Sequence, residues 1–270
     1  MSPSRLSTLL FVLLWAMSLP AGADYTFNMT PGITEISRGI HHLHMTIFWI
    51  CVAIGTGVFG VMFYAIIWHR KSQGATAAQF HENTMVEIIW TLIPFTILIL
   101  MAIPAAQLLL KMHNTEESDL SIKIVGHQWY WEYEYLGEDV KIISRLATPQ
   151  DQINNRDIKG QHYLREVDNP IVVPEKKKIR FLTTSNDVIH AWWMPALGIK
   201  RDAIPGFINE AWANIDHTGT YRGQCAELCG ALHGFMPIVL EVKTEAEYQT
   251  WLSAKKAENL KPTPIQSNTP

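Results

Sequence analysis

The chain has 270 residues, of which 48% are hydrophobic, and 22 Lys and Arg against 25 Asp and Glu give a formal net charge of -3. A chain of this length holds one large domain or two smaller ones. The slightly acidic balance argues against nucleic acid as a partner. Three cysteines are too few for a disulfide framework in a chain of this size.

Residues 1–23 have the features of a cleaved secretory signal peptide. Arg5 provides the positive start, LLFVLLWAM is a short apolar run, and AGA precedes Asp24 as a small-residue cleavage site. An uncleaved transmembrane helix is the alternative, but the apolar run is short for a span. We therefore expect an exported N-terminus.

Two long apolar segments follow, at about 42–68 and 86–110. Each exceeds the roughly 20 apolar residues that cross a bilayer; buried helices of a soluble domain are the alternative. Arg70 and Lys71 follow the first span and favour a cytoplasmic linker. With the signal removed, residues 24–111 would form an N-terminal segment and hairpin. The rest of the chain would then lie in the periplasm, attached to a bacterial inner membrane.

The exported part is expected to be an all-β domain spanning 112–243. Short runs such as KIRFLTT and MPIVLEV are separated by Gly, Pro and Asn/Asp clusters. Many short strands at this spacing predict a sandwich or a small barrel. Within the final segment, 244–270, Thr244 and Glu247 form a capping box for one helix, and a polar, Pro-rich tail is expected to be disordered.

Soft metal ligands are concentrated in RGQCAELCGALHGFMPIV, residues 222–239, which contains Cys225, Cys229, His233 and Met236. A disulfide is one interpretation, because exported cysteines usually oxidise, but it leaves the His and Met unexplained. A structural zinc site is another, although Met is a poor zinc ligand. Thiolate, thioether and imidazole together favour copper, and the second cysteine indicates two bridged ions. A second imidazole is then needed, and His190 in TTSNDVIHAWWMP, placed after a strand, is the candidate.

At these motifs the chain resembles subunit II of cytochrome c oxidase. CAELCGALHGFM with the upstream DVIHAWWMP is similar to the binuclear copper site, CuA, of that family. GHQWYWEYEY, VEIIWTLIP, KRDAIPGFINEAW and YRGQCAELCG also resemble that subunit, in its order, so that the resemblance covers residues from about 35 to 243. It implies a membrane-anchored chain with a two-helix transmembrane hairpin followed by an all-β cupredoxin-like sandwich.

The resemblance implies a complete ligand set for two copper ions. Cys225 and Cys229 would bridge the ions, and His190 and His233 would each bind one of them. Met236 would be a weak axial ligand, and the backbone carbonyl of Glu227 would serve the other copper. The side chain of Glu227 would reach a magnesium ion shared with subunit I; a solvated loop glutamate is the alternative.

The resemblance also implies how a partner meets the domain. Trp129 would be the exposed ring through which electrons enter from cytochrome c, although strand packing is the alternative. Acidic residues would help to dock a Lys-rich cytochrome c, mainly by raising its association rate, unless they only form a solvated face. They are Glu132, Glu134, Glu138, Asp139, Asp187 and Asp202.

Glu87 is the single carboxylate in either apolar segment. An ionisable group inside a span is a functional candidate, and the resemblance places it at the cytoplasmic mouth of a proton path into subunit I. Its position near the start of the second span leaves an alternative, since an acid suits a helix N-terminus at the membrane interface.

We therefore expect the electron-transfer subunit of a proton-translocating oxidase. It would take single electrons from cytochrome c on the periplasmic side and pass them to haem in subunit I, supporting the reduction of oxygen to water. Subunit I, subunit III and the bilayer are the expected neighbours. A membrane-tethered protein that stores or delivers copper is one alternative, and a structural subunit with a disulfide is another. C-x-x-C-H is absent from the sequence, so electrons would come from a separate carrier.

Overall fold

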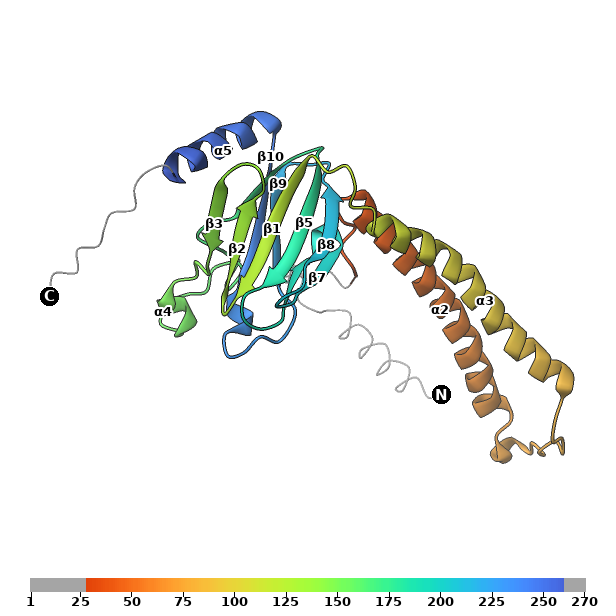
Figure 1. The fold of residues 1–270 in the computed structure, drawn as a ribbon. Coiled ribbons are helices and arrows are strands. Elements are labelled where there is room, and N and C mark those ends of the chain that lie inside the picture. Colours follow the sequence, from red (N-terminus) through yellow and green to blue (C-terminus); the bar gives the residue numbers. More distant parts are fainter. Residues whose placement is uncertain (1–27, 260–270) are drawn as a thin grey trace. The chain divides into compact units, whose positions relative to one another are not determined.

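The computed structural model describes residues 28–259 of the chain. The predicted signal peptide and the tail beyond residue 259 lie outside the described residues, so both predictions stand as made. Within the described part, two long helices are followed by a β-sandwich and one further helix (Figure 1).

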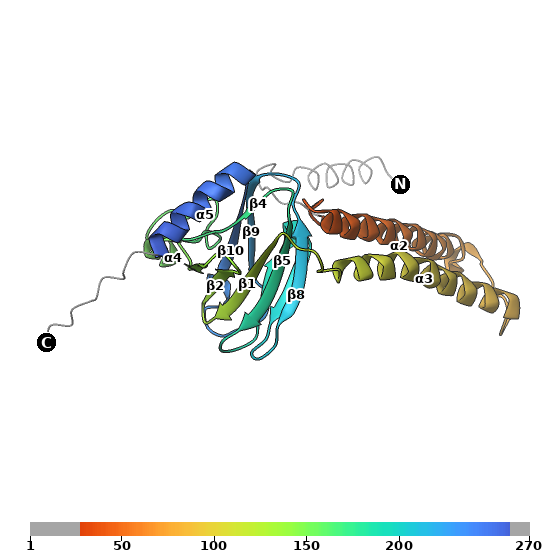
Figure 2. The ribbon, with the colours of Figure 1, turned by 45° about the horizontal axis from the view of Figure 1, so that its top comes forward.

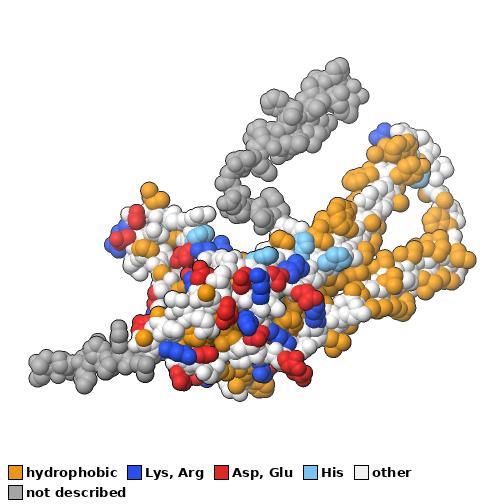
Figure 3. Space-filling model, turned by 90° about the horizontal axis from the view of Figure 1, so that it is seen from above, with side chains coloured by type: hydrophobic (Ala, Val, Ile, Leu, Met, Phe, Trp, Pro, Cys, Tyr) orange, Lys and Arg blue, Asp and Glu red, His pale blue; other side chains and the backbone are white. Residues whose placement is uncertain are grey.

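The two helices are α2 (Glu35–Trp68) and α3 (Thr84–Met112), and they contain the two predicted spans. At 1.5 Å per residue both are longer than the roughly 30 Å hydrocarbon core of a bilayer. Their apolar windows are exposed rather than buried in the protein, and hydrophobic side chains cover most of their surface in Figure 3. Side chains of Thr34 and Asn83 cap the two N-termini. A short 3-10 helix, η1 (Lys71–Gln73), lies in the connection.

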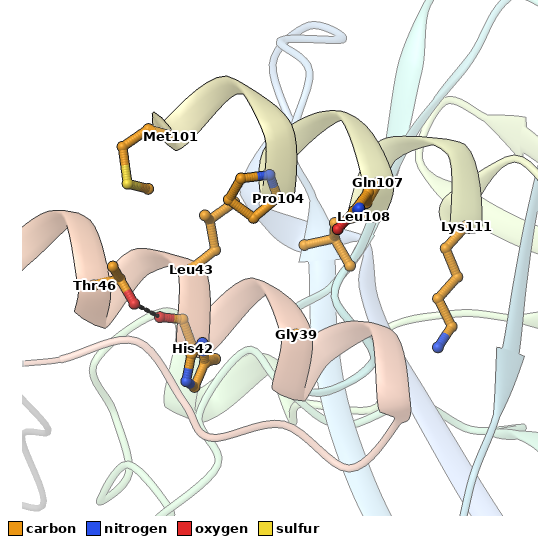
Figure 4. A pocket seen from close by; sticks show the side chains of 9 residues that line it. All are labelled: Gly39, His42, Leu43, Thr46, Met101, Pro104, Gln107, Leu108 and Lys111. Atoms are coloured by element: carbon orange, nitrogen blue, oxygen red, sulfur yellow. Dashed lines mark hydrogen bonds between the residues drawn. The ribbon is translucent and has the colours of Figure 1, made fainter. Parts of the chain in front are cut away.

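Gly39 lets the two helices approach each other closely. A Cβ atom at this position would lie 2.9 Å from Cδ1 of Leu108 on α3. Beside this contact is a hollow of about 420 Å³, which Leu43 and His42 of α2 line together with Pro104 and Gln107 of α3 (Figure 4). The hollow belongs to the hairpin and contains none of the predicted copper ligands.

Within residues 28–259, ten strands form two five-stranded sheets that face each other (Figure 2). The first sheet has the order β3-β2-β1-β5-β8 and the second the order β4-β10-β9-β6-β7. The strands are β1 (Leu120–His127), β2 (Tyr130–Tyr135), β3 (Val140–Ser144), β4 (Ile171–Pro174), β5 (Lys178–Ser185), β6 (His190–Met194), β7 (Ile199–Ala203), β8 (Asn209–Asn214), β9 (Gly219–Cys225) and β10 (Pro237–Lys243). The predicted sandwich is therefore present.

The strands that the sequence predicts are found, and three further strands complete the second sheet. β5 alternates strictly between half-buried and buried residues, which is the pattern that makes a strand recognisable. β6, β7 and β9 lack such a pattern: β6 is buried almost throughout, β7 carries charges, and β9 begins at a glycine. Short helices at α4 (Gln150–Ile153), η2 (Pro195–Leu197) and η3 (His233–Phe235) were also not predicted.

The core lies between the two sheets and is rich in large aromatic side chains. Trp131, Tyr133 and Phe181 from the first sheet and Trp192 from the second are fully buried. The rings of Phe181 and Trp192 stack across the two sheets with centroids 5.1 Å apart. Aromatic contacts of this kind add to the free energy of burial and fix the relative position of the two sheets.

The last helix, α5 (Glu245–Asn259), begins with the predicted capping box. The backbone N–H of Thr244 donates to Glu247, and the Thr244 hydroxyl caps the backbone N–H of Glu247 in return. Tyr248 and Leu252 of this helix are buried against the sandwich.

The start of α2 contacts the sandwich directly. Thr34 forms a β-bridge with Ile215, and its hydroxyl donates to the backbone carbonyl of Leu197. The backbone N–H of Ile33 donates to the carbonyl of Ala196. Residues that precede the first span are thus bonded to the turn that follows β6, the strand on which His190 lies.

Candidate metal centre

Three connections meet at one end of the sandwich. His127 pairs with Tyr130, so β1 and β2 are joined there by the two-residue turn Gln128–Trp129. The turn between β5 and β6 is at the same end, because β1 runs parallel to β5. The loop from Cys225 to Met236 joins β9 to β10 there, since Gln224 pairs with Pro237. We call this the copper end, because it holds all the predicted copper ligands.

The structure brings the predicted ligands together. The Sγ atoms of Cys225 and Cys229 are 3.9 Å apart, and Nδ1 of His190 is 3.9 Å from Sγ of Cys225. Nδ1 of His233 is 3.5 Å from Sγ of Cys229, and Sδ of Met236 is 3.6 Å from the same sulfur. The carbonyl oxygen of Glu227 lies 3.4 Å from Sγ of Cys225. Each sulfur therefore faces one imidazole and one weaker donor.

This arrangement fits two bridged copper ions. Both cysteines are free and buried, so the disulfide interpretation is wrong for this structure. Two sulfurs 3.9 Å apart can share one metal ion at an ordinary metal–thiolate distance of about 2.3 Å. The donors divide into two similar sets, each of an imidazole with Met236 or the Glu227 carbonyl, around a shared thiolate pair. Within residues 28–259, His190, Cys225 and Cys229 are the one group of three or more His, Cys, Asp or Glu side chains close enough to hold a metal ion.

The two thiols differ in acidity before any metal binds. Burial raises the pKa of Cys225, but hydrogen bonds from His190 and from backbone groups outweigh burial and bring this pKa down to about 7. Burial, together with the neighbouring Cys225 thiolate, raises the pKa of Cys229 to about 12. Metal binding requires the thiolate form. The positive charge of a bound metal would favour the thiolate form of both cysteines.

Asp187 fixes the orientation of His190. Its Oδ1 lies 2.9 Å from Nε2 of His190, which is fully buried. The opposite ring nitrogen, Nδ1, is thereby left facing Cys225. Gly126 on β1 makes room for the ring, because a Cβ there would lie 2.7 Å from Cδ2 of His190. This role of Asp187 was not predicted from the sequence, in which the spacing Asp-x-x-His was the available signal.

Trp129 lies directly on the loop from Cys225 to Met236, which we call the copper loop. Its Nε1 donates to the carbonyl of Cys229 at 3.2 Å, and the residue is half-buried against the core rather than fully exposed. Gln128, which the sequence analysis did not single out, donates from Nε2 to the same carbonyl at 2.8 Å. Behind them, Nε1 of the buried Trp131 donates to the carbonyl of Met236.

The predicted docking acids are divided between two ends of the sandwich. β2 starts at the copper end, so Glu138 and Asp139, which follow its last residue, lie at the opposite end, where Glu138 pairs with Lys256 of α5. Glu132 pairs with Lys141 at 2.8 Å, and Glu134 is 3.5 Å from Lys123. Asp187 is bound to His190, whereas Asp202 is exposed at the copper end.

Glu87 is far from the copper end of the domain. It lies in the first turn of α3, and α3 continues for 25 further residues to Met112, which is about 38 Å of helix. Glu87 lines a hollow of about 490 Å³ together with His81, Glu82 and Trp90. The structure therefore does not bring Glu87 into the metal centre.

Comparison with known proteins agrees with this geometry. Residues 120–243 match the family model "Cytochrome C oxidase subunit II, periplasmic domain", and residues 22–108 match the model for the transmembrane domain of the same subunit. The "Probable cytochrome c oxidase subunit 2" of Rickettsia felis is 40% identical over 239 residues, which are 88% of this chain and 74% of the relative. The chain belongs to the cytochrome c oxidase subunit II family.

Two further relatives extend the comparison. Cytochrome c oxidase subunit 2 of Arabidopsis thaliana is 39% identical over 86% of this chain and 90% of its own length. The crystal structure of the periplasmic domain of subunit II of cytochrome oxidase from Bradyrhizobium japonicum is 43% identical, with a TM-score of 0.48, over 53% of this chain and 98% of that chain.

Membership of this family gives the chain its place in the cell and its general function. It is an electron-transfer subunit of the cytochrome c oxidase complex, held in the membrane by α2 and α3, with its sandwich in the periplasm. His190, Cys225, Cys229 and Met236 are ligands of its copper site. These matches do not support the alternative of a copper storage or delivery protein.

Proposed function

We propose that electrons from cytochrome c enter this subunit through Trp129. The observation that carries the proposal is the hydrogen bond from Nε1 of Trp129 to the carbonyl of Cys229, one of the two bridging cysteines. It places an aromatic ring one hydrogen bond from the backbone of a copper ligand. Copper held by the two thiolates supplies a one-electron redox centre whose charge is shared across both ions. The rigid sandwich keeps the surrounding donors in place whichever redox state is present.

His233 and the carbonyl of Glu227 complete the proposed ligand set. Nδ1 of His233 faces Sγ of Cys229, as Nδ1 of His190 faces Sγ of Cys225. The side chain of Glu227 is exposed, and it is therefore free to reach a magnesium ion shared with subunit I. Carboxylate oxygen is a ligand that magnesium prefers, and this ion keeps few protein ligands.

The proposed docking surface for cytochrome c is the copper end. It exposes Leu228, Leu232, Val188 and Ile189 around the metal centre, and Asp202 contributes a negative charge at its margin. An apolar patch with acids at its rim suits a partner that presents an apolar surface among lysines. This geometry does not support a docking role for Glu138 and Asp139, because both residues follow the end of β2 that is opposite the copper end.

We also propose that Glu87 lies at the cytoplasmic mouth of a proton path into subunit I. Glu87 lines the same hollow as His81 and Glu82, at the end of α3 farthest from the sandwich. A cluster of groups that bind and release protons at a membrane surface suits the collection of protons from water.

The experiment for electron acceptance compares Trp129→Phe with Trp251→Phe in the assembled oxidase. Phe keeps a ring at residue 129 but loses the hydrogen bond to Cys229. Trp251 lies on α5 against Tyr135, away from the copper end, and serves as the matched control. Rapid mixing with reduced cytochrome c should show electron acceptance slowed by at least about tenfold in Trp129→Phe only, with the copper spectrum unchanged. Equal rates in the two variants would remove the proposed role of Trp129.

A further inference from the structure

We infer that Gln128 is a positioning residue that holds Trp129 against the copper loop. This inference rests on the proposed role of Trp129. Gln128 and Trp129 form the two-residue turn between β1 and β2. Such a turn projects from the sheet, and the strands alone do not determine where a large ring at its tip will lie.

The side chain of Gln128 ties the tip of this turn to the loop between β9 and β10. Its Nε2 donates to the carbonyl of Cys229 at 2.8 Å, and Nε1 of Trp129 donates to the same oxygen at 3.2 Å. A carbonyl oxygen has two lone pairs, so both are used. The hydrogen bond from the Gln128 side chain is the shorter of the two. Gln128 directly precedes Trp129 in the chain, so this hydrogen bond holds the backbone next to the indole.

A second contact of Gln128 ties the turn to the loop that carries His190. The backbone N–H of Gln128 donates to Oδ2 of Asp187 at 2.7 Å, while Oδ1 of the same carboxylate is 2.9 Å from Nε2 of His190. The residue before Trp129 is therefore bonded to both loops that supply copper ligands. If either contact moves, the indole moves relative to the metal centre.

Gly230 provides independent support for close packing at this point. Its backbone φ of +115° is one that residues other than glycine rarely adopt. A Cβ at this position would lie 3.0 Å from Nε2 of Gln128 and 3.1 Å from Cζ2 of Trp129. The copper loop thus has no side chain where Gln128 and Trp129 contact it, and a side chain at residue 230 would crowd both.

Gln128 itself is exposed, so its amide competes with water for the Cys229 carbonyl. Its effect should therefore be that of one hydrogen bond of ordinary strength, acting on the equilibrium between a held and a released indole. Without it, Trp129 keeps only its own single bond to the loop. The fraction of time in which the ring is in position falls, and electron transfer slows in proportion.

The test uses the assembled oxidase with Gln128→Ala, Gln128→Met and Gln161→Ala, with Trp129→Phe as the reference. Met has about the length of Gln but no N–H donor, so it separates the hydrogen bond from packing. Gln161 is an exposed glutamine in the connection between β3 and β4 and serves as the control. The measured quantities are the rate of electron transfer within the bound complex, the KM for cytochrome c and the copper spectrum.

We expect both Gln128 variants to transfer electrons about fivefold more slowly within the bound complex. The copper spectrum should be unchanged in both Gln128 variants, and the rate should be unchanged in Gln161→Ala. A full rate in Gln128→Met, or in both Gln128 variants, while Trp129→Phe is slow would overturn the inference and leave the proposed function intact. A full rate in Trp129→Phe would instead refute the role of Trp129 on which the inference depends.

Discussion

Oδ1 of Asp187 lies 2.9 Å from Nε2 of His190 and leaves Nδ1 of the imidazole facing Cys225. The remaining contacts of the carboxylate are with Ser185 and with the backbone N–H groups of Val188 and Gln128. Both carboxylate oxygens of Asp187 already accept hydrogen bonds within the protein, so few acceptor positions remain for a lysine of a docking partner. Asp187 is thus better placed to orient a copper ligand than to bind lysines of cytochrome c.

Asp187→Asn should weaken copper binding by about 10- to 100-fold, the usual cost of losing the partner that orients a metal-binding histidine. The amide that replaces the carboxylate no longer fixes the ring by charge, and it can present a donor to Nε2 and favour the wrong tautomer. Competition for copper between the purified oxidase and a chelator of known affinity measures the change.

Asp202→Asn is the matched control, because Asp202 is an exposed acid at the same end of the sandwich. It should leave copper retention unchanged and weaken the salt dependence of cytochrome c binding. If Asp187→Asn instead retains copper normally and alters the salt dependence of cytochrome c binding, Asp187 contributes to docking rather than to the orientation of His190.

Glu87→Gln should slow steady-state oxygen consumption, by about tenfold if proton uptake through this path limits turnover. Gln has the size of Glu but neither binds nor releases a proton at neutral pH. The KM for cytochrome c and the first electron transfer to the subunit should not change, because Glu87 lies at the other end of α3. Glu245→Gln, at the exposed start of α5 and away from this hollow, is the control.

Oxygen consumption at the normal rate in Glu87→Gln would favour the other interpretation of this residue. The carboxylate would then serve as an acid in the first turn of α3, where it interacts favourably with the helix dipole.

Much of this structure could be predicted from the sequence, and the reasons differ from element to element. The apolar lengths of α2 and α3 and the alternation of β5 are local patterns, and they were recognised. β6 and β9 carry or border the copper ligands, but β6 is buried on both faces and β9 starts at a glycine, so neither alternates. Their identity as strands depends on pairing with each other and, further, of β9 with β10 and of β6 with β7.

In the metal centre too, the features that are local in the sequence could be predicted, and those that depend on distant contacts could not. Cys225, Cys229, His233 and Met236 stand close together in the sequence, and their chemistry indicated copper. Gln128 and Cys229 are 101 residues apart, and no local pattern predicts that an amide will meet a backbone carbonyl across that separation. The carboxylate of Asp187 was recognised as lying near the site, but its direction is set by the turn between β5 and β6.

The free energy of the sandwich should also depend on pH through Glu210. Hydrogen bonds from Arg180 and Thr115 lower the pKa of this carboxyl below its ordinary value. A group whose pKa is lower in the folded state stabilises that state above its unfolded pKa, and the contribution is lost as pH falls through the folded value. Because Glu210 is partly exposed, we expect less than about 1 kcal/mol.

Amide hydrogen exchange in β8, corrected for the intrinsic rate at each pH, measures this contribution. Glu210→Gln should reduce protection at neutral pH, and the difference from the wild-type protein should shrink below about pH 4. Glu245→Gln, at the exposed start of α5, should leave β8 unchanged at every pH. A difference in Glu210→Gln that grows as the pH falls would contradict the assigned direction.

We expect Cys225 and Cys229 together to hold two copper ions that share one electron. Electron paramagnetic resonance of the oxidised complex tests it most directly, because the hyperfine pattern reports how many copper nuclei share the unpaired electron. The expected result is a hyperfine pattern from two equivalent copper nuclei, which is lost when Cys229 is replaced by serine. A pattern from a single copper nucleus at this site, or a shared pattern that survives in Cys229→Ser, would contradict it.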